Sequence, residues 1–271
     1  MTNSLVTSLQ VSRLLAAVFF LLPSALLGIT VTNTNDTGPG SLRRAVVIAN
    51  LAPGPNTIEF ALGSGAQTIT LTSGAIEITD ELTITGPADF ADHVRISGNN
   101  SSGIFEIRNT TAPIVLENLT VRDGGATGII AEAGTDLRLN NCAIRDNDSA
   151  GGTGFGGGLY ANGATVVAEN CTFQANQARS GGGVMIGGSG DVTLLNATVH
   201  GNEAENHGGG MFVSLGTLTM IIPWVAPHRR LVEAQHPLAE NAQASARNGA
   251  FDCARDDRAT SRSQRRSELG T

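Results

Sequence analysis

The chain repeats one short pattern around four asparagines, Asn118, Asn141, Asn170 and Asn196, which are separated by 23, 29 and 26 residues. Apolar residues stand four and two positions before each asparagine, and one and three positions after it. All sixteen positions fit: Ile114, Leu116, Leu119, Val121, Leu137, Leu139, Cys142, Ile144, Val166, Ala168, Cys171, Phe173, Val192, Leu194, Ala197 and Val199. A repeat of this length is typical of a solenoid, in which each unit stacks on the next.

The spacing of the apolar residues indicates two short strands that meet at each asparagine. Apolar residues two apart form the inward face of a strand, and the interval of three across the asparagine requires a bend. Asparagine tolerates the left-handed backbone region that such a bend needs. The four side-chain amides are therefore expected to stack as a ladder. A helical period of 3.6 residues would not give this spacing, which excludes amphipathic helices here.

The second half of each unit has its own signature. Asn147, Asn176 and Asn202 stand six residues after the reference asparagine, where the first unit has Gly124, and we interpret them as polar turn residues. Glycine runs at 156–158, 181–183 and 208–210 then precede apolar residues, and such runs allow sharp turns between closely packed coils. Each unit thus contains three strands, and the sequence predicts an all-β, right-handed parallel β-helix.

The repeats are expected to occupy residues 57–219, preceded by an N-terminal cap over residues 29–56. Within the cap, Ser41 to Asn50 reads as a short helix, with Ser41 as its N-cap. Its apolar stripe consists of Leu42, Ala45, Val46 and Ala49. A helix placed here would cover the open end of the first coil and its unpaired strand edges.

The two ends of the chain differ from the repeats. Residues 1–28 read as a signal peptide, with Arg13 before the apolar run 14–22, and the alternative is an uncleaved membrane anchor over 14–31. Beyond this segment we expect no transmembrane helix. Residues 220–271 lose the repeat and read as an irregular tail. The tail is either a C-terminal cap with Trp224 packed on the last coil, or the product of a frameshift that truncates a longer β-helix.

The cysteines, histidines and overall charge exclude several classes of function. Cys142 and Cys171 share one inward position on adjacent coils, and we expect buried free thiols there rather than a disulfide. We interpret His200 and His207 as surface polar residues without a partner set. No metal-binding spacing is present, and the net charge of −7 argues against nucleic-acid binding.

Candidate chemistry rests on carboxylates at one corner of the predicted coils. Asp123 and Asp146 each follow the reference asparagine by five residues, so they are expected to stack one coil apart, near Asp148 and Arg122 or Arg145. Such a cluster can bind Ca²⁺ or act as an acid and base pair. The alternative, which we favour, is that these are solvated turn residues, with no cofactor bound. Glu117 and Glu169 are expected to point outward with Asn140 between them.

Two segments resemble known families. Residues 40–45 (GSLRRA), with 49–50 (AN), 53–54 (PG) and 56–60 (NTIEF), resemble the CSLREA domain, although Gly40 and Arg44 replace its Cys and Glu. Residues 173–176 (FQAN), followed by 182–184 (GGV), resemble the repeat of polymorphic outer-membrane proteins, of which 144–147 and 199–202 are degenerate copies. These resemblances imply a secreted or outer-membrane, adhesin-like β-helix, and they imply no catalytic residues.

The functional expectation is a binding or structural rod rather than an enzyme. Its outward side chains, such as Thr120, Thr172 and Thr198, would be presented to a host or neighbouring-cell surface, whether glycan or protein. The alternative is a carbohydrate-active enzyme, of polyuronate lyase or glycoside hydrolase type, that uses Asp123 and Asp146. The aromatic content of 4% counts against sugar stacking and therefore against the enzyme. A third reading is a truncated product without function.

Overall fold

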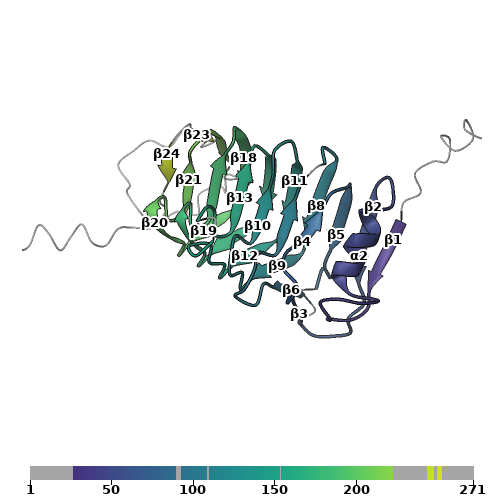
Figure 1. Ribbon diagram of the computed structural model, residues 1–271. Helices are drawn as coiled ribbons and strands as arrows, with labels where there is room; N and C mark the ends of the chain where they lie inside the picture. Colours follow the sequence, from purple (N-terminus) through teal and green to yellow (C-terminus); the bar gives the residue numbers. More distant parts are fainter. Residues whose placement is uncertain are drawn as a thin grey trace, which may run out of the picture.

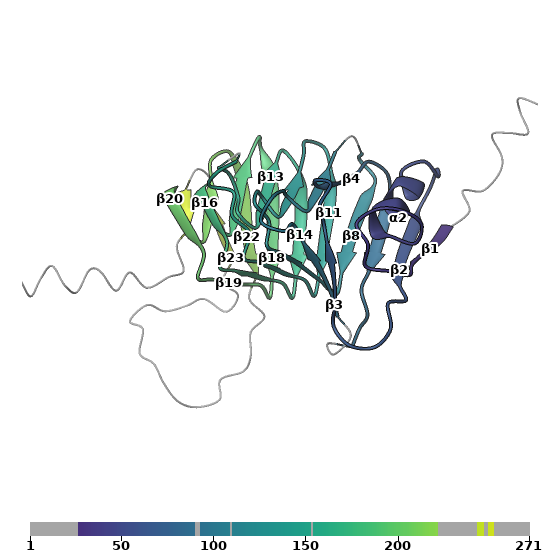
Figure 2. The same cartoon turned by 60° about the horizontal axis from the view of Figure 1, so that its bottom comes forward.

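The computed structural model describes residues 27–89, 93–108, 110–152, 154–221, 243–246 and 249–251. It is a parallel β-helix: the chain passes repeatedly from a nine-stranded sheet to a six-stranded sheet and then to a seven-stranded sheet (Figures 1 and 2). The predicted fold class is confirmed. Most of the predicted signal peptide and tail lies outside the described residues; Leu27 and Gly28, which we assigned to the signal, open the first strand.

Each complete coil adds one in-register strand to each of the three main sheets. The nine-stranded sheet contains β1 (Leu27–Val31), β2 (Asn56–Phe60), β5 (Leu82–Thr85), β8 (Pro113–Glu117), β11 (Asp136–Asn140), β14 (Thr165–Glu169), β18 (Gly190–Leu195), β22 (Gly216–Ile221) and β23 (Gln243–Ala246). The six-stranded sheet contains β3 (Gln67–Thr70), β6 (Val94–Ser97), β9 (Leu119–Arg122), β12 (Ala143–Arg145), β15 (Thr172–Gln174) and β19 (Thr198–His200). The seven-stranded sheet contains β4 (Ile76–Ile78), β7 (Phe105–Ile107), β10 (Ile129–Ala131), β13 (Leu159–Asn162), β17 (Val184–Gly187), β21 (Met211–Val213) and β24 (Gly249–Phe251).

Two further strands and the last two pairings complete the topology. A short two-stranded sheet pairs β16 (Gln177–Ser180) with β20 (Glu203–His207). Successive coils pair in parallel, whereas β23 and β24 pair antiparallel to β22 and β21. The last repeat strand, β22, ends at Ile221, two residues beyond the predicted end of the repeats. Two short segments of the predicted tail, β23 and β24, pair with the final coil.

One hydrophobic cluster runs through the coils. Fourteen of the sixteen predicted apolar positions are buried, and the other two, Ala197 and Val199, are partly buried against the cluster. These two flank Thr198 in β19, the last strand of its sheet among the described residues, so no further coil covers them there. The period-two interpretation of the strands is thus confirmed.

The predicted bends are also confirmed. Asn118, Asn141, Asn170 and Asn196 have φ between 49° and 54°, the left-handed region. Their side-chain ladder is bonded at two of its three steps: Asn141 Nδ2 donates to Asn118 Oδ1 at 3.3 Å, and Asn196 Nδ2 donates to Asn170 Oδ1 at 2.6 Å.

Asn147, Asn176 and Asn202 lie in the connections after β12, β15 and β19, where the polar turn was predicted, but all three side chains are buried. Asn147 Nδ2 donates to Asn176 Oδ1 at 2.9 Å, and Asn176 Nδ2 donates to Asn202 Oδ1 at 3.0 Å. The Gly124 backbone N–H donates to Asn147 Oδ1 at 2.9 Å, so Gly124 begins this second, internal ladder. The ladder satisfies polar groups inside the coils.

The N-terminal cap contains the predicted helix, α2 (Leu42–Ala49), which covers the first coil (Figure 1). Ser41 Oγ accepts the Arg44 N–H at 3.2 Å as the N-cap, and the four predicted stripe residues are buried. Asp36 joins the cap to the coil: it accepts the Arg43 Nε–H at 2.9 Å and the Thr72 N–H at 2.9 Å.

Candidate functional site

Asp123 and Asp146 occupy a second left-handed bend, after β9 and β12. Their φ values are 52° and 55°, and Ala175 and Gly201, at the equivalent positions in the next two coils, have φ of 52° and 63°. The bend therefore persists where the carboxylate does not. Aspartate is among the residues that tolerate this conformation, which explains its presence here without any chemistry.

The two carboxylates lie in a run of ion pairs. Arg122 Nε is 2.7 Å from Asp123 Oδ2, Arg122 Nη2 is 3.7 Å from Asp146 Oδ2, and Arg145 pairs with Asp146. Ser97 Oγ also donates to Asp123 Oδ2 at 3.3 Å. The structure thus brings together the predicted pair and both arginines. A Ca²⁺ ion at this corner would have to compete with two guanidinium groups for the same oxygens.

Asp148 belongs to a different local arrangement. Its Oδ1 accepts the Ala150 N–H at 2.9 Å, which closes a turn, and its backbone bridges to Gln177. Among the residues that the structure describes, no group of three or more His, Cys, Asp or Glu side chains is arranged to hold a metal ion. Glu117, Asn140 and Glu169 share one outward register position, as predicted.

Cys142 and Cys171 are buried free thiols on adjacent coils, which confirms that prediction. The neighbouring Cys171 thiol, together with burial, raises the pKa of Cys142 well above its usual value. Cys142 therefore remains a protonated thiol at neutral pH, and it packs as a small apolar group.

The threonine row and His207 both differ from expectation. Thr120 is only 5% exposed, so the predicted outward row of threonines is presented at Thr172 and Thr198 but not at Thr120. His207 is not an isolated surface residue: its ring stacks on Phe212 with centroids 5.0 Å apart, and its Nδ1 lies 3.4 Å from Ser180 Oγ.

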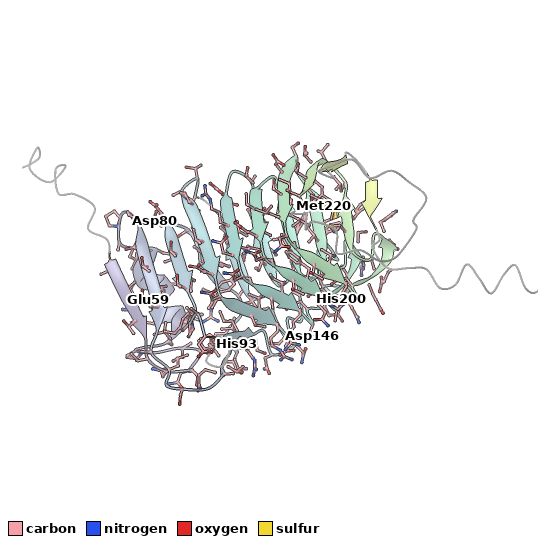
Figure 3. The ribbon with its side chains drawn as sticks, turned by 180° about the vertical axis from the view of Figure 1, so that it is seen from behind. Glu59, Asp80, His93, Asp146, His200 and Met220 are labelled. Atoms are coloured by element: carbon pink, nitrogen blue, oxygen red, sulfur yellow. The ribbon has the colours of Figure 1, made fainter. Side chains whose placement is uncertain are left out.

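His200 is exposed at the end of β19, and Figure 3 shows it with Asp146 and His93 along one long edge of the solenoid.

The feature that sequence reasoning missed is an apolar row on the outer face of the seven-stranded sheet. Ile130, Tyr160, Met185 and Phe212 occupy one register position on successive coils, and we call them the apolar strip. The inward residues of the same strands are the neighbours before them, Ile129, Leu159, Val184 and Met211, so the strip residues lie on the other side of the sheet from the core. Ile130, Tyr160 and Phe212 are half-buried there, whereas Met185 is only 4% exposed. The sequence does contain an indication of the strip. Each glycine run is followed by two apolar residues, whereas a strand with one solvated face would have a polar residue at the second position.

Aromatic side chains beside the strip enlarge it. Phe155, which is 41% exposed, lies with its ring centroid 5.6 Å from that of Tyr160. His207 stacks on Phe212 at the other end. Phe155 and the half-buried Tyr160 and Phe212 therefore gather on one face. Their grouping weakens the argument against sugar binding that we drew from the low aromatic content.

The strip continues toward the N-terminal cap as a charged surface. Glu77 and Glu106 precede Ile130 at the same register position, and Arg108 pairs with both carboxylates, at 2.8 Å and 3.2 Å. Burial, and secondly the charge of Glu132, raise the pKa of the Tyr160 phenol. The phenol is thus a neutral hydroxyl that can donate a hydrogen bond at the middle of the strip.

Comparison with known proteins gives one match. A family described as the right-handed β-helix region matches residues 56–221, from the start of β2 to the end of β22. A search of curated proteins finds none that matches the chain. Within the described residues, no helix has the length and hydropathy needed to cross a bilayer.

Proposed function

Because the chain belongs to the right-handed β-helix family, we propose that it is an exported, adhesin-like binding module that holds an extended partner along the apolar strip. The single observation that carries the proposal is the alignment of Ile130, Tyr160, Met185 and Phe212 on one outer face. Export is supported by the signal pattern of residues 1–28, and the CSLREA-like segment at 40–60 supports a surface or outer-membrane location.

The geometry of the sheet suits an elongated ligand. In-register strands place one outward side chain per coil at a spacing of about 4.8 Å, so the four strip residues extend over roughly 14 Å. Regular strands hold these side chains rigidly, and a rigid surface loses little conformational entropy when it binds. Aromatic residues are also the side chains most enriched at the centres of binding surfaces.

The side chains of the strip indicate which chemical groups a partner would present to it. Apolar and aromatic groups would contact the apolar faces of a glycan chain or of an extended protein segment. The Tyr160 hydroxyl and the amide of Asn162, which donates to Glu132 at 2.8 Å, add polar groups beside the strip. The paired charges of Glu77, Glu106 and Arg108 mark where the apolar surface ends.

A carbohydrate-active enzyme, of polyuronate lyase or glycoside hydrolase type, is the alternative that the fold also accommodates. Its candidate residues, Asp123 and Asp146, lie at the bend after the six-stranded sheet and are paired with Arg122 and Arg145. The strip lies on a different sheet. Binding and catalysis are therefore separable by mutation.

The test is binding of the purified full chain to arrayed glycans and to immobilised cell-surface protein, with Tyr160→Ser and Phe212→Ser as variants. Val167→Ser is the matched control, because Val167 faces outward from the nine-stranded sheet, aligned with Arg138 and Thr193. We expect the strip variants to weaken binding about tenfold or more, while the control binds as the wild type does.

Two outcomes would reject the proposal. Equal binding by strip and control variants would place the partner elsewhere. Release of unsaturated product from a polyuronate, lost in Asp146→Ala but retained in Tyr160→Ser, would instead establish the enzyme.

A further inference from the structure

The row of side chains that contains the apolar strip continues beyond Ile130. The two preceding coils place Glu77 and Glu106 at the same outward register position, in β4 and β7. One row along the solenoid axis therefore begins with two carboxylates and continues as apolar surface to Phe212, from β4 to β21 (Figure 1). With one side chain per coil, the whole row spans roughly 24 Å.

A second outward row lies beside the first, two residues further along the same strands. It contains Arg108 after β7, Glu132 after β10 and Asn162 at the end of β13. The Glu132 backbone N–H donates to Ile107 O at 2.9 Å, which keeps Glu132 in register beside Arg108. Asn162 Nδ2 donates to Glu132 Oε2 at 2.8 Å. The Glu132 carboxylate is therefore held beside β13, the strand that carries Tyr160.

Three carboxylates on this face share one guanidinium. Arg108 pairs with Glu77 at 2.8 Å and with Glu106 at 3.2 Å. The hydrogen bond to Glu77, then the charge of Glu106 and lastly that of Glu132, raise the pKa of Arg108. One positive and three negative charges leave a net charge of −2 on these four side chains, and Asn109, the undescribed residue beside them in the chain, is uncharged. The side chains of Glu77 and Arg108 are 46% and 40% exposed, so a partner can approach these charges.

This surface selects a partner by charge as well as by hydrophobicity. An acidic glycan such as a polyuronate would meet repulsion at the carboxylates, and a neutral glycan would gain nothing from them. An extended protein segment can carry both kinds of group that the face requires. Its alternate side chains lie about 6.6 Å apart on one side, so three apolar side chains at alternate positions cover about 13 Å, close to the length of the strip. A cationic side chain two to four positions further along then reaches the carboxylates.

We propose that the partner held along the apolar strip is an extended basic segment of protein, whose alternate apolar side chains contact the strip and whose Lys or Arg side chains pair with Glu106 and Glu132. This inference rests on the proposed function, because it names the class of partner for the same surface. Arg108 opposes this binding, since it reduces the negative charge of the face.

The experiment is titration of labelled nine-residue peptides with the full chain, followed by fluorescence anisotropy. The basic peptide alternates leucine and serine and carries two lysines at one end, and the acidic peptide has glutamates in place of the lysines. Glu132→Gln removes one negative charge from the face, and Arg108→Gln removes its positive charge. Glu169→Gln and Arg138→Gln are the matched controls, because they make the same changes on the outer face of the nine-stranded sheet.

We expect the basic peptide to bind about tenfold more tightly than the acidic peptide. Glu132→Gln should weaken binding of the basic peptide about threefold, whereas Arg108→Gln should strengthen it about threefold. The two control variants should stay within about 1.5-fold of the wild type, since their charges lie on another sheet. Sodium chloride at about 0.5 M should remove most of the difference between the two peptides.

The outcomes separate this inference from the proposed function. Equal binding of the basic and acidic peptides, with both weakened by Phe212→Ser, would overturn the basic partner and leave the strip as the binding surface. Strip-dependent binding of a glycan without binding of the basic peptide would do the same, as would shifts of equal sign in Glu132→Gln and Arg108→Gln. If Phe212→Ser changes the binding of no peptide and no glycan, the proposed function fails and this inference fails with it.

Discussion

Asn147 Nδ2 lies 2.9 Å from Asn176 Oδ1 in the interior of the solenoid, and the same oxygen accepts the Asn147 backbone N–H at 3.2 Å. Asn176 in turn makes both contacts with Asn202. Each Nδ2 also donates to a backbone carbonyl in the preceding coil, as Asn176 does to Ile144 O at 2.9 Å. One side chain therefore satisfies polar groups on both sides of it.

Replacing Asn176 with alanine should destabilise the protein by about 3 kcal/mol, because it leaves several buried polar groups without partners. Asn140→Ala is the comparison, since Asn140 faces outward and should change the free energy of unfolding by less than about 0.5 kcal/mol. Urea denaturation followed by circular dichroism measures both. Equal losses in the two variants would mean that the internal ladder contributes little.

Gly158→Ala should also destabilise the coils, for a steric reason. A Cβ at Gly158 would lie 2.6 Å from Gly183 O and 3.0 Å from Asn176 Nδ2, so the next coil must move away. We expect a loss of about 2 kcal/mol. Gly151→Ala is the control, because a Cβ there meets no atom within 4 Å. Thermal melting of both variants checks this prediction, which fails if their melting temperatures agree.

The stability of the N-terminal cap should depend on pH through Asp36. Burial acts to raise the pKa of Asp36, but hydrogen bonds from Thr72, Ser73 and Arg43 outweigh it and lower the pKa from 3.8 to about 2. A depressed folded-state pKa stabilises the protein above the unfolded pKa, and the contribution is lost as the pH falls from about 4 to 2. The shift corresponds to about 2 kcal/mol.

Asp36→Asn should therefore weaken the cap at pH 7 and lose most of its difference from the wild type by pH 2. Hydrogen exchange of the amides in α2, measured across this pH range, follows the cap directly. A wild-type and variant difference that stays constant between pH 4 and 2 would contradict the role assigned to the Asp36 carboxylate.

Asp146→Gly should leave the free energy of unfolding within about 0.5 kcal/mol of the wild type, whereas Asp146→Ala should cost about 1 kcal/mol. Glycine adopts the left-handed bend freely and alanine does not, while loss of a half-exposed ion pair matters little. Ca²⁺ at millimolar concentration should not change the melting temperature. A rise of several degrees that disappears in Asp146→Gly would identify a calcium site instead.

The sequence predicts the strands, the inward residues and the asparagine bends, because each depends on local spacing. Asn118 and its equivalents could be identified since the apolar interval changes from two to three at that residue alone. The burial of Asn176 was not predicted, because spacing cannot distinguish a polar residue in a solvated turn from one buried between coils. Its burial depends on Gly158, whose missing side chain leaves room for the Asn176 amide of the next coil, as Gly183 does for Asn202.

The candidate surfaces depend on stacking between coils and were harder to predict. Tyr160 and Phe212 are 52 residues apart in sequence, and only the register of β13, β17 and β21 places them in one row. The burial of Thr120 is likewise a tertiary property that no local pattern shows. By contrast, the sharing of one corner by Asp123 and Asp146 followed directly from their equal distance from the reference asparagines.

In the four coils that follow β8, most of the variation in chain length comes directly after the second left-handed bend. From Asp123, Asp146, Ala175 and Gly201 to the first inward residue of the third strand, the chain takes 6, 13, 9 and 10 residues. From that inward residue to the next reference asparagine it takes 12, 11 and 12. Among these four coils, most of the variation in length thus falls at one corner, beside the apolar strip. Evolution, or a protein engineer, can lengthen and diversify the loops that border a ligand there while the register of every strand stays unchanged.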